Sequence, residues 1–157
     1  MMDQRRRTLL KSTSVAGTLG LAFAGGILKP SELLAADWNK AAFGASNVGD
    51  TLKTLGAASP TESKDIAIKA PEIAENGAVV PVEVTATLSN TQSIAIIVEK
   101  NPVPLAAEFN LANGAEPFVA TRVKMAETSR IIALVKAGDK HYTAAKEVKV
   151  TIGGCGG

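Results

Sequence analysis

From Ile66 onward, apolar and polar side chains alternate with a period of two residues, and this alternation restricts the fold more than any other feature. The segment from Val80 to Leu88 shows it most clearly. Short alternating runs predict strands that are buried on one face. The segment from Ile94 to Val98 is instead continuously apolar, which is typical of a strand buried on both faces.

Clusters of turn-forming residues separate these runs at intervals of roughly ten residues. The turns are expected at 75–77, 89–91, 101–104, 113–114, 127–129 and 137–139. Further strands are expected at 108–111, 118–124, 130–135, 141–145 and 147–152. About seven or eight short strands predict a mainly β fold, an immunoglobulin-like antiparallel β-sandwich. We expect this domain to span residues 59–152.

Residues 37–58 are expected to form a short N-terminal helical segment. Apolar side chains recur there every three or four positions, at Trp38, Ala41, Ala42, Val48, Leu52 and Leu55. Asn47 or Asp50 is a suitable N-cap for a second piece, whereas Gly44 and Gly49 weaken a single continuous helix. One helix and two short helical pieces both remain open.

Residues 1–36 have the order of an export signal. A basic start is followed by an uncharged apolar stretch, Val15–Leu28, which is too short to span a bilayer, and by small residues at 34–36. The sequence Arg-Arg-Thr-Leu-Leu-Lys, which begins with Arg6 and Arg7, resembles the twin-arginine pattern. We therefore expect a cleaved twin-arginine signal peptide and export of the folded protein to the periplasm.

Removing this expected signal changes the charge of the chain. Residues 1–36 hold five of the 17 Lys and Arg residues and two of the 15 Asp and Glu residues, which leaves 12 basic and 13 acidic residues and a net charge of −1. No run of basic residues survives, so we expect no nucleic-acid partner. No other stretch is apolar enough to cross a membrane.

The chain has one cysteine, Cys155. A single cysteine cannot form an internal disulfide, so in an exported protein it indicates an intermolecular disulfide or a free thiol with a function. Its neighbours carry no side chains: they are Gly153, Gly154, Gly156 and Gly157. Because glycine is thin and conformationally permissive, we expect residues 153–157 to be a flexible carrier arm that places the thiol roughly 10 Å beyond Ile152.

The thiol has no activating neighbour in the sequence, such as a cation, a histidine or a helix N-terminus. Activation is therefore expected to come from an enzyme that receives the arm. A free thiol can hold another thiol, a sulfane sulfur or an oxidised cap. A lone thiolate lacks the co-ligands of a metal site, so no metal is expected.

Other residues are expected to be structural. His141 is the only histidine and lies beside Tyr142 in a predicted strand, and Trp38 is expected to pack in a core or a partner interface. No catalytic residues are predicted, so the chain is expected to be acted on by enzymes and not to be one. A secreted assembly or adhesion module, with Cys155 in an intermolecular disulfide, is the alternative.

Several segments carry a resemblance to a known family. The strongest is the terminal Gly-Gly-Cys-Gly-Gly, and the softer ones are Glu75-Asn76-Gly77 before a Val-Pro-Val strand, Asn101-Pro102 followed by Pro104-Leu105, Thr121–Met125 and Val148–Thr151. Together they resemble the SoxY family, the sulfur-carrier subunits of the bacterial thiosulfate-oxidising Sox system. The likeness covers nearly all of the chain behind the signal.

The resemblance implies a function and a set of partners. The chain would form a heterodimer with a SoxZ-type β-sandwich subunit and be exported together with it. Cys155 would hold every sulfur intermediate, first a thiosulfonate and then a persulfide, with no other cofactor. The arm would present them in turn to a thiosulfate-conjugating cytochrome, a sulfate-releasing hydrolase and a sulfur dehydrogenase.

Overall fold

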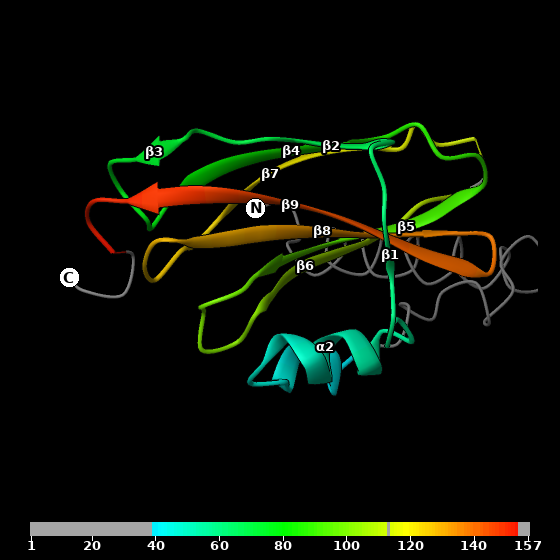
Figure 1. Cartoon of the computed structure of the whole chain (residues 1–157), viewed down its shortest axis with the longest axis horizontal. Coiled ribbons are helices and arrows are strands. Elements are labelled where there is room, and N and C mark those ends of the chain that lie inside the picture. The colour runs from blue at the N-terminus through cyan, green and yellow to red at the C-terminus, as the bar shows by residue number, and fades with distance from the viewer. Residues whose placement is uncertain (1–38, 113, 154–157) are drawn as a thin grey trace, which may run out of the picture. The chain divides into compact units, whose positions relative to one another are not determined.

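The structure, a computed structural model, describes residues 39–112 and 114–153. About half of these residues form two β-sheets that face each other (Figure 1). The larger sheet has the strand order β1-β9-β8-β5-β6, with β3 also paired to β9, and the smaller sheet has the order β2-β4-β7. The predicted β-sandwich is confirmed.

The smaller sheet follows the predicted alternation. It contains β2 (Ile66–Lys69), β4 (Val80–Ala86) and β7 (Phe118–Val123), all antiparallel. In β4 the alternate residues from Val80 to Ala86 are buried, and the residues between them face outward. The sheet therefore turns one apolar face toward its partner sheet.

The larger sheet is built around β5 (Thr91–Val98), between β8 (Ser129–Ala137) and β6 (Leu105–Asn110). Ile94 and Ile96 belong to the core between the sheets, whereas Ala95 and Ile97 belong to a second cluster on the other face. The prediction that this run is buried on both faces is confirmed.

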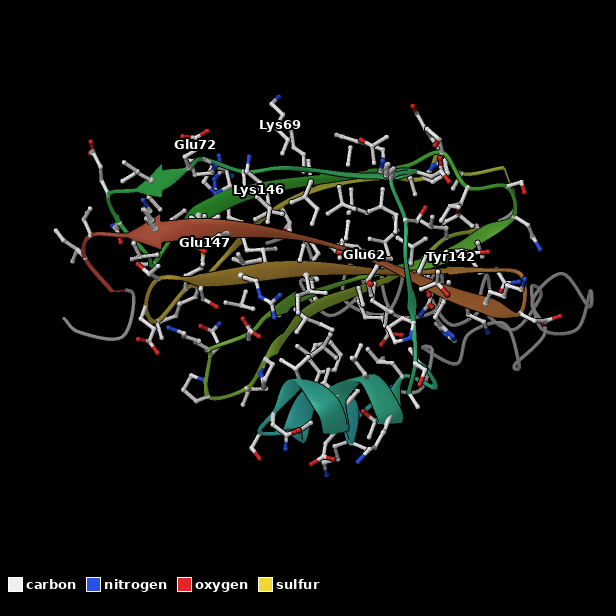
Figure 2. The ribbon with its side chains drawn as sticks, in the orientation of Figure 1. Glu62, Lys69, Glu72, Tyr142, Lys146 and Glu147 are labelled. Atoms are coloured by element: carbon white, nitrogen blue, oxygen red, sulfur yellow. The ribbon has the colours of Figure 1, made fainter. Side chains whose placement is uncertain are left out.

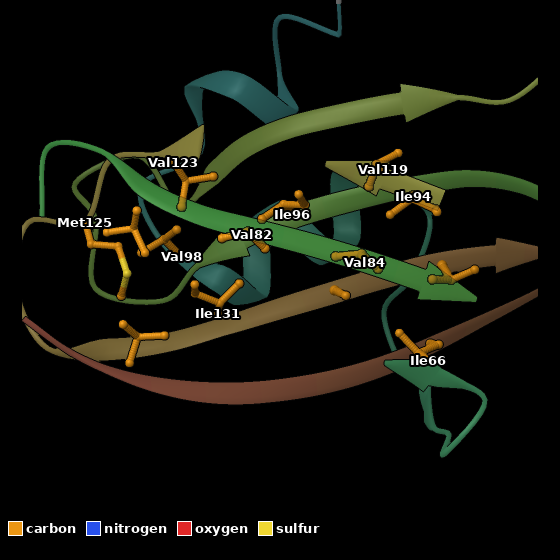
Figure 3. Close-up of a cluster of buried hydrophobic side chains, with 14 of the residues drawn as sticks. Ile66, Val82, Val84, Ile94, Ile96, Val98, Val119, Val123, Met125 and Ile131 are labelled. Carbon is orange, nitrogen blue, oxygen red and sulfur yellow. The ribbon is translucent and has the colours of Figure 1, made fainter. Parts of the chain in front are cut away.

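The core between the sheets consists of isoleucine, valine and alanine side chains and one methionine, with further side chains packed at its border (Figure 3). Met125 is fully buried although it lies in a loop directly after β7. Met125 therefore closes one end of the core.

Two short helical pieces cover the second face of the larger sheet: η2 (Ala42–Gly44) and α2 (Val48–Thr54) (Figure 1). The Asp50 amide donates to Asn47 Oδ1 at 2.8 Å, which makes Asn47 the N-cap of α2. Of the two alternatives left open by the sequence, the two-piece segment is the one observed. Within the described residues, no helix is long and apolar enough to cross a membrane.

The prediction of separate strands at 141–145 and 147–152 is wrong, because β9 runs unbroken from Lys140 to Val150. The apparent interruption is Lys146, which lies two residues after the inward-facing Ala144 and so occupies the next inward position of β9. The Lys146 ammonium leaves the core by donating to the Ala70 carbonyl at 2.7 Å (Figure 2). A long side chain can thus occupy an inward position without burying its charge.

Two strands of two residues flank β9 and were not predicted: β1 (Thr61–Glu62) and β3 (Ile73–Ala74). Both pair with β9 in parallel, β1 near its beginning and β3 at its end, so the sandwich is not purely antiparallel. Such short strands carry no alternation that a sequence pattern can reveal.

Candidate functional site

The final described residues follow directly from β9. We call Thr151, Ile152 and Gly153 the arm root, because the predicted carrier arm continues from them. The last strand was predicted to run to Ile152, but β9 ends at Val150 and Ile152 is 65 % exposed. The strand pairing of β8 with β9 stops at Ser129 and Val148, so the chain beyond this point needs other partners.

The first group of partners comes from β3 and the turn that follows it. The Thr151 amide donates to the Ala74 carbonyl at 3.1 Å, and its hydroxyl donates to the Glu75 carbonyl at 3.1 Å. The Gly77 amide donates to the Ile152 carbonyl at 2.8 Å. The arm root therefore donates hydrogen bonds to β3 and this turn through Thr151, and accepts one from the turn through the Ile152 carbonyl.

The second group comes from the loop between β7 and β8. The Val150 amide donates to Thr128 Oγ1 at 2.9 Å. Gly153 lies directly against the backbone of Ala126, so close that a Cβ atom on Gly153 would overlap the Ala126 carbonyl oxygen. This loop thus covers the arm root on the side that β3 leaves open.

Asn101 holds that loop in place. Its Nδ2 donates to the Lys124 carbonyl at 2.7 Å, and its Oδ1 accepts from the Ala126 amide at 2.9 Å. The Met125 amide donates to the Gly77 carbonyl at 2.7 Å and so links the loop to the turn. The turn after β3 and the loop between β7 and β8 form two walls around the arm root. These walls are therefore bonded to each other as well as to the chain that continues from β9.

These contacts bring together the softer segments of the sequence resemblance: Glu75-Asn76-Gly77, Asn101-Pro102, Thr121–Met125 and Val148–Thr151. They are far apart in the chain but meet at the end of β9 (Figure 1). Thr128 belongs to this site too, and the sequence analysis placed it only in a turn. A hydroxyl near the start of a strand is too common to have singled it out.

Exposed apolar side chains lie on the segments that meet at the arm root. Ile73, Val79 and Ile152 are three of the five large hydrophobic side chains that the described residues expose, at 57 %, 53 % and 65 %. Ile73 is paired with Lys149 in β9, and Val79 follows the Gly77 turn. A single exposed apolar residue means little, but three beside one chain end indicate a contact surface.

Most of the predicted functional residues lie outside the described residues. These are Arg6, Arg7, Trp38, Gly154, Cys155, Gly156 and Gly157. Of the predicted arm, only Gly153 is described.

His141 lies at the other end of β9, beside a cavity of about 180 Å³. Burial and then the charge of Lys136 hold the pKa of His141 below its usual value. Ten residues of strand separate His141 from Thr151, about 33 Å at the usual rise per residue. The imidazole is therefore too far from the arm root to activate a thiol there.

Charged groups near the arm root are exposed. Arg130 and Glu99 form a bidentate pair, with Nη2 2.7 Å from Oε1 and Nε 3.0 Å from Oε2. The hydrogen bond from Arg130 lowers the pKa of Glu99 below its usual value. In the described part of the chain, no group of three His, Cys, Asp or Glu side chains could hold a metal ion.

Comparison with known proteins shows that this chain is similar to a sulfur carrier protein of known structure. The sulfur carrier protein SoxY from Chlorobium limicola f thiosulfatophilum is 42 % identical, with a TM-score of 0.62; the match covers 68 % of this chain and 98 % of that one. A superoxide reductase (neelaredoxin) from Ignicoccus hospitalis is 22 % identical over 54 % of this chain and 79 % of that one, with a TM-score of 0.48, too low to support an argument.

No match was found among curated proteins. The family model described as "Sulfur oxidation protein SoxY" matches residues 52–155, which include every segment of the arm root and its walls. The chain therefore belongs to the SoxY family.

Proposed function

We propose that this protein is a covalent sulfur carrier of a Sox system and that Cys155 is the attachment site. The observation that carries the proposal is the site at the end of β9. Two segments of the chain, residues 74–77 and the loop that contains Ala126, hold residues 151–153, and the only thiol of the chain follows two residues later. The family match extends to residue 155 and so includes this cysteine.

The proposed loading step joins thiosulfate to the thiol. The Cys155 sulfur forms a bond to the outer sulfur of thiosulfate, the thiol proton leaves to water, and an electron pair leaves to the conjugating cytochrome. The product is a Cys-bound thiosulfonate. A thiol without an activating neighbour in the sequence needs a base in the receiving enzyme, which fits a carrier that is a substrate and not a catalyst.

The proposed unloading steps restore the thiol. A hydrolase adds water to the terminal sulfur, which releases sulfate and leaves a persulfide on Cys155. A sulfur dehydrogenase then adds water oxygens to the remaining sulfane sulfur and takes up the electrons. A second hydrolysis releases sulfate and returns the thiol. No resident cofactor on the carrier is needed.

The length of the arm restricts how an enzyme can approach. Two residues of extended chain span at most about 7 Å, so Cys155 stays within that distance of Gly153, Cα to Cα. An enzyme that encloses the thiol must therefore come close to Ile73, Val79 and Ile152. The exposed apolar side chains there are suited to brief contact with the mouth of an active-site channel.

We also propose a heterodimer with a SoxZ-type subunit and residence in the periplasm. The Arg6-Arg7 signal supports export after folding, which allows a partner without a signal to be carried along.

The direct test is intact mass spectrometry of the processed protein from cells grown on thiosulfate, before and after a reductant. Added mass equal to thiosulfate or to sulfur atoms, removed by the reductant and absent in Cys155→Ser, is the expected result. The same spectrum reports where the signal is cleaved.

Two other outcomes would count against the proposal. A spectrum with only the bare chain would show that Cys155 holds no sulfur adduct and would contradict the carrier function. A spectrum with only a disulfide-linked species would favour the assembly module, in which Cys155 is a crosslink.

A further inference from the structure

We infer that Gly153 is a positioning residue, fixed against the protein body, and that the reach of the proposed carrier arm is counted from it. The inference rests on the proposed function, because it concerns how Cys155 is presented. A spacer glycine would be interchangeable with alanine at little cost, whereas Gly153 has a neighbour that a Cβ would overlap.

The overlap cannot be relieved easily from the side of the loop. The Ala126 carbonyl belongs to a segment whose amides are already bonded, Ala126 to Asn101 Oδ1 and Met125 to the Gly77 carbonyl. Met125 is also fully buried in the core. Moving the carbonyl would break these contacts, so a Cβ on residue 153 must displace the chain end instead.

Displacing the chain end has a specific consequence. The Ile152 carbonyl accepts the Gly77 amide at 2.8 Å, and Ile152 directly precedes Gly153. A shift of residue 153 away from Ala126 therefore pulls this carbonyl from its donor. The Thr151 amide, bonded to Ala74 one residue earlier, is less affected.

The same shift moves the starting point of the arm. Since only Gly154 lies between Gly153 and Cys155, the arm cannot compensate a displacement of its root without losing reach. Misplacement of a reacting group by about 1 Å can lower a rate by as much as 100-fold. Fixing the root therefore makes the delivery of the thiol reproducible from one enzyme to the next.

The first measurement is amide hydrogen exchange in the carrier heterodimer, for wild type and Gly153→Ala. Exchange of the Gly77 amide is expected to become about tenfold faster in the variant, as for loss of one hydrogen bond. The Ala86 amide, bonded to Pro117 elsewhere in the sandwich, should not change. The matched control is Gly44→Ala, because a Cβ at Gly44 meets nothing within 4 Å.

The second measurement compares two reactions of Cys155 in the same variants. Loading with thiosulfate by the conjugating cytochrome is expected to fall about tenfold in kcat/KM in Gly153→Ala. Reaction with a small disulfide reagent, which needs no docking, should stay unchanged. A purely structural defect would not separate these two rates. When one extra glycine is inserted directly after position 153 of the Gly153→Ala variant, loading should recover but the protection of Gly77 should not.

A third measurement needs no variant and covers the case in which Gly153→Ala fails to fold. In wild type, the order parameter of the Gly153 amide should match that of Val150, about 0.85, and a value below about 0.6 would overturn the inference. Unchanged Gly77 exchange in Gly153→Ala would overturn it as well. Failure of wild type to load would reject the proposed function, while the Gly77 exchange would still decide whether Gly153 anchors the chain.

Discussion

The two ends of β9 are held in different ways. At its beginning, β9 is joined to β8 by a tight turn in which Gly138 has a φ of 58°, a conformation that favours glycine. At its end, β9 extends past β8. Its last two amides bond to Glu72 and Thr128, and the amide of the next residue, Thr151, bonds to Ala74. One end is a local hairpin, and the other is assembled from distant segments.

Within this one strand, the beginning contributes mainly to the stability of the fold, and the end mainly fixes the position of the chain that follows. Near the beginning of β9, Tyr142 and Ala144 pack against the core between the sheets, and Leu134, which pairs with Thr143, lies in the cluster beneath α2, so burial provides the stabilisation there. Beyond the buried Val148 and the partly buried Val150, the chain gains little burial, since Thr151 and Ile152 are exposed, but several directional hydrogen bonds hold it. Such an arrangement is suited to fixing a chain end in space.

The largest expected effect is at the proposed arm itself. Cys155→Ser should abolish every sulfur adduct, because a hydroxyl does not form the sulfur–sulfur bond of the intermediates. Intact mass spectrometry after incubation with thiosulfate and the conjugating cytochrome measures this. The unfolding midpoint should not change, and adducts that persist in the variant would place the attachment site elsewhere.

The next largest effect concerns the region around the beginning of β9. Leu134→Ala, in the cluster beneath α2, should lower the free energy of unfolding by about 2–5 kcal/mol, because it leaves a cavity. Urea denaturation measures this. Loading of Cys155 per folded molecule should stay normal, and slower loading under fully folding conditions would show that the two ends are coupled.

Asn101→Ala tests the wall of the arm root. The loss of two hydrogen bonds should cost about 1–2 kcal/mol of stability. Because the Ala126 loop loosens, kcat/KM for loading should also fall. Asn110→Ala, at the exposed end of β6, is the control; an equal effect of both variants on loading would argue against a role for this wall.

Ile152→Ser tests the exposed apolar surface. Stability should change by no more than about 0.5 kcal/mol, as for most surface substitutions. The KM for a partner enzyme should rise and kcat should hold, because contacts of the docked complex are lost. Phe118→Ser is the matched control, since Phe118 is 45 % exposed and pairs with Thr85 away from the arm root. Equal KM values for both variants would contradict the docking role.

The smallest effect concerns His141. Because its pKa is lowered in the folded protein, the unfolded chain binds a proton more readily, and stability should fall as the pH drops below the unfolded value of about 6.5. His141→Gln should flatten this part of the pH–stability profile and leave loading unchanged. A profile identical to that of wild type would show that the imidazole titrates alike in both states.

Much of the fold could be predicted because its signals are local. The alternation in β4 and the continuous run in β5 each follow from which faces are buried, and the pattern alone reveals this. The prediction failed at Lys146, because a charged residue on an inward position reads as a break. Only the neighbouring Ala70 carbonyl, on a different segment, explains why the strand continues.

The candidate site divides in the same way. By itself, the amino-acid sequence determined the chemistry: one thiol, at Cys155, between glycines that carry no competing group. Tertiary structure alone decided where that chemistry starts. Only after the two sheets have packed does Ala126 meet Gly153, Gly77 bond to Ile152 and Asn101 hold the Ala126 loop. The physical reason is that hydrogen bonds between distant segments produce no periodic pattern in the sequence, whereas the residue types of the C-terminal tail are given by the sequence itself.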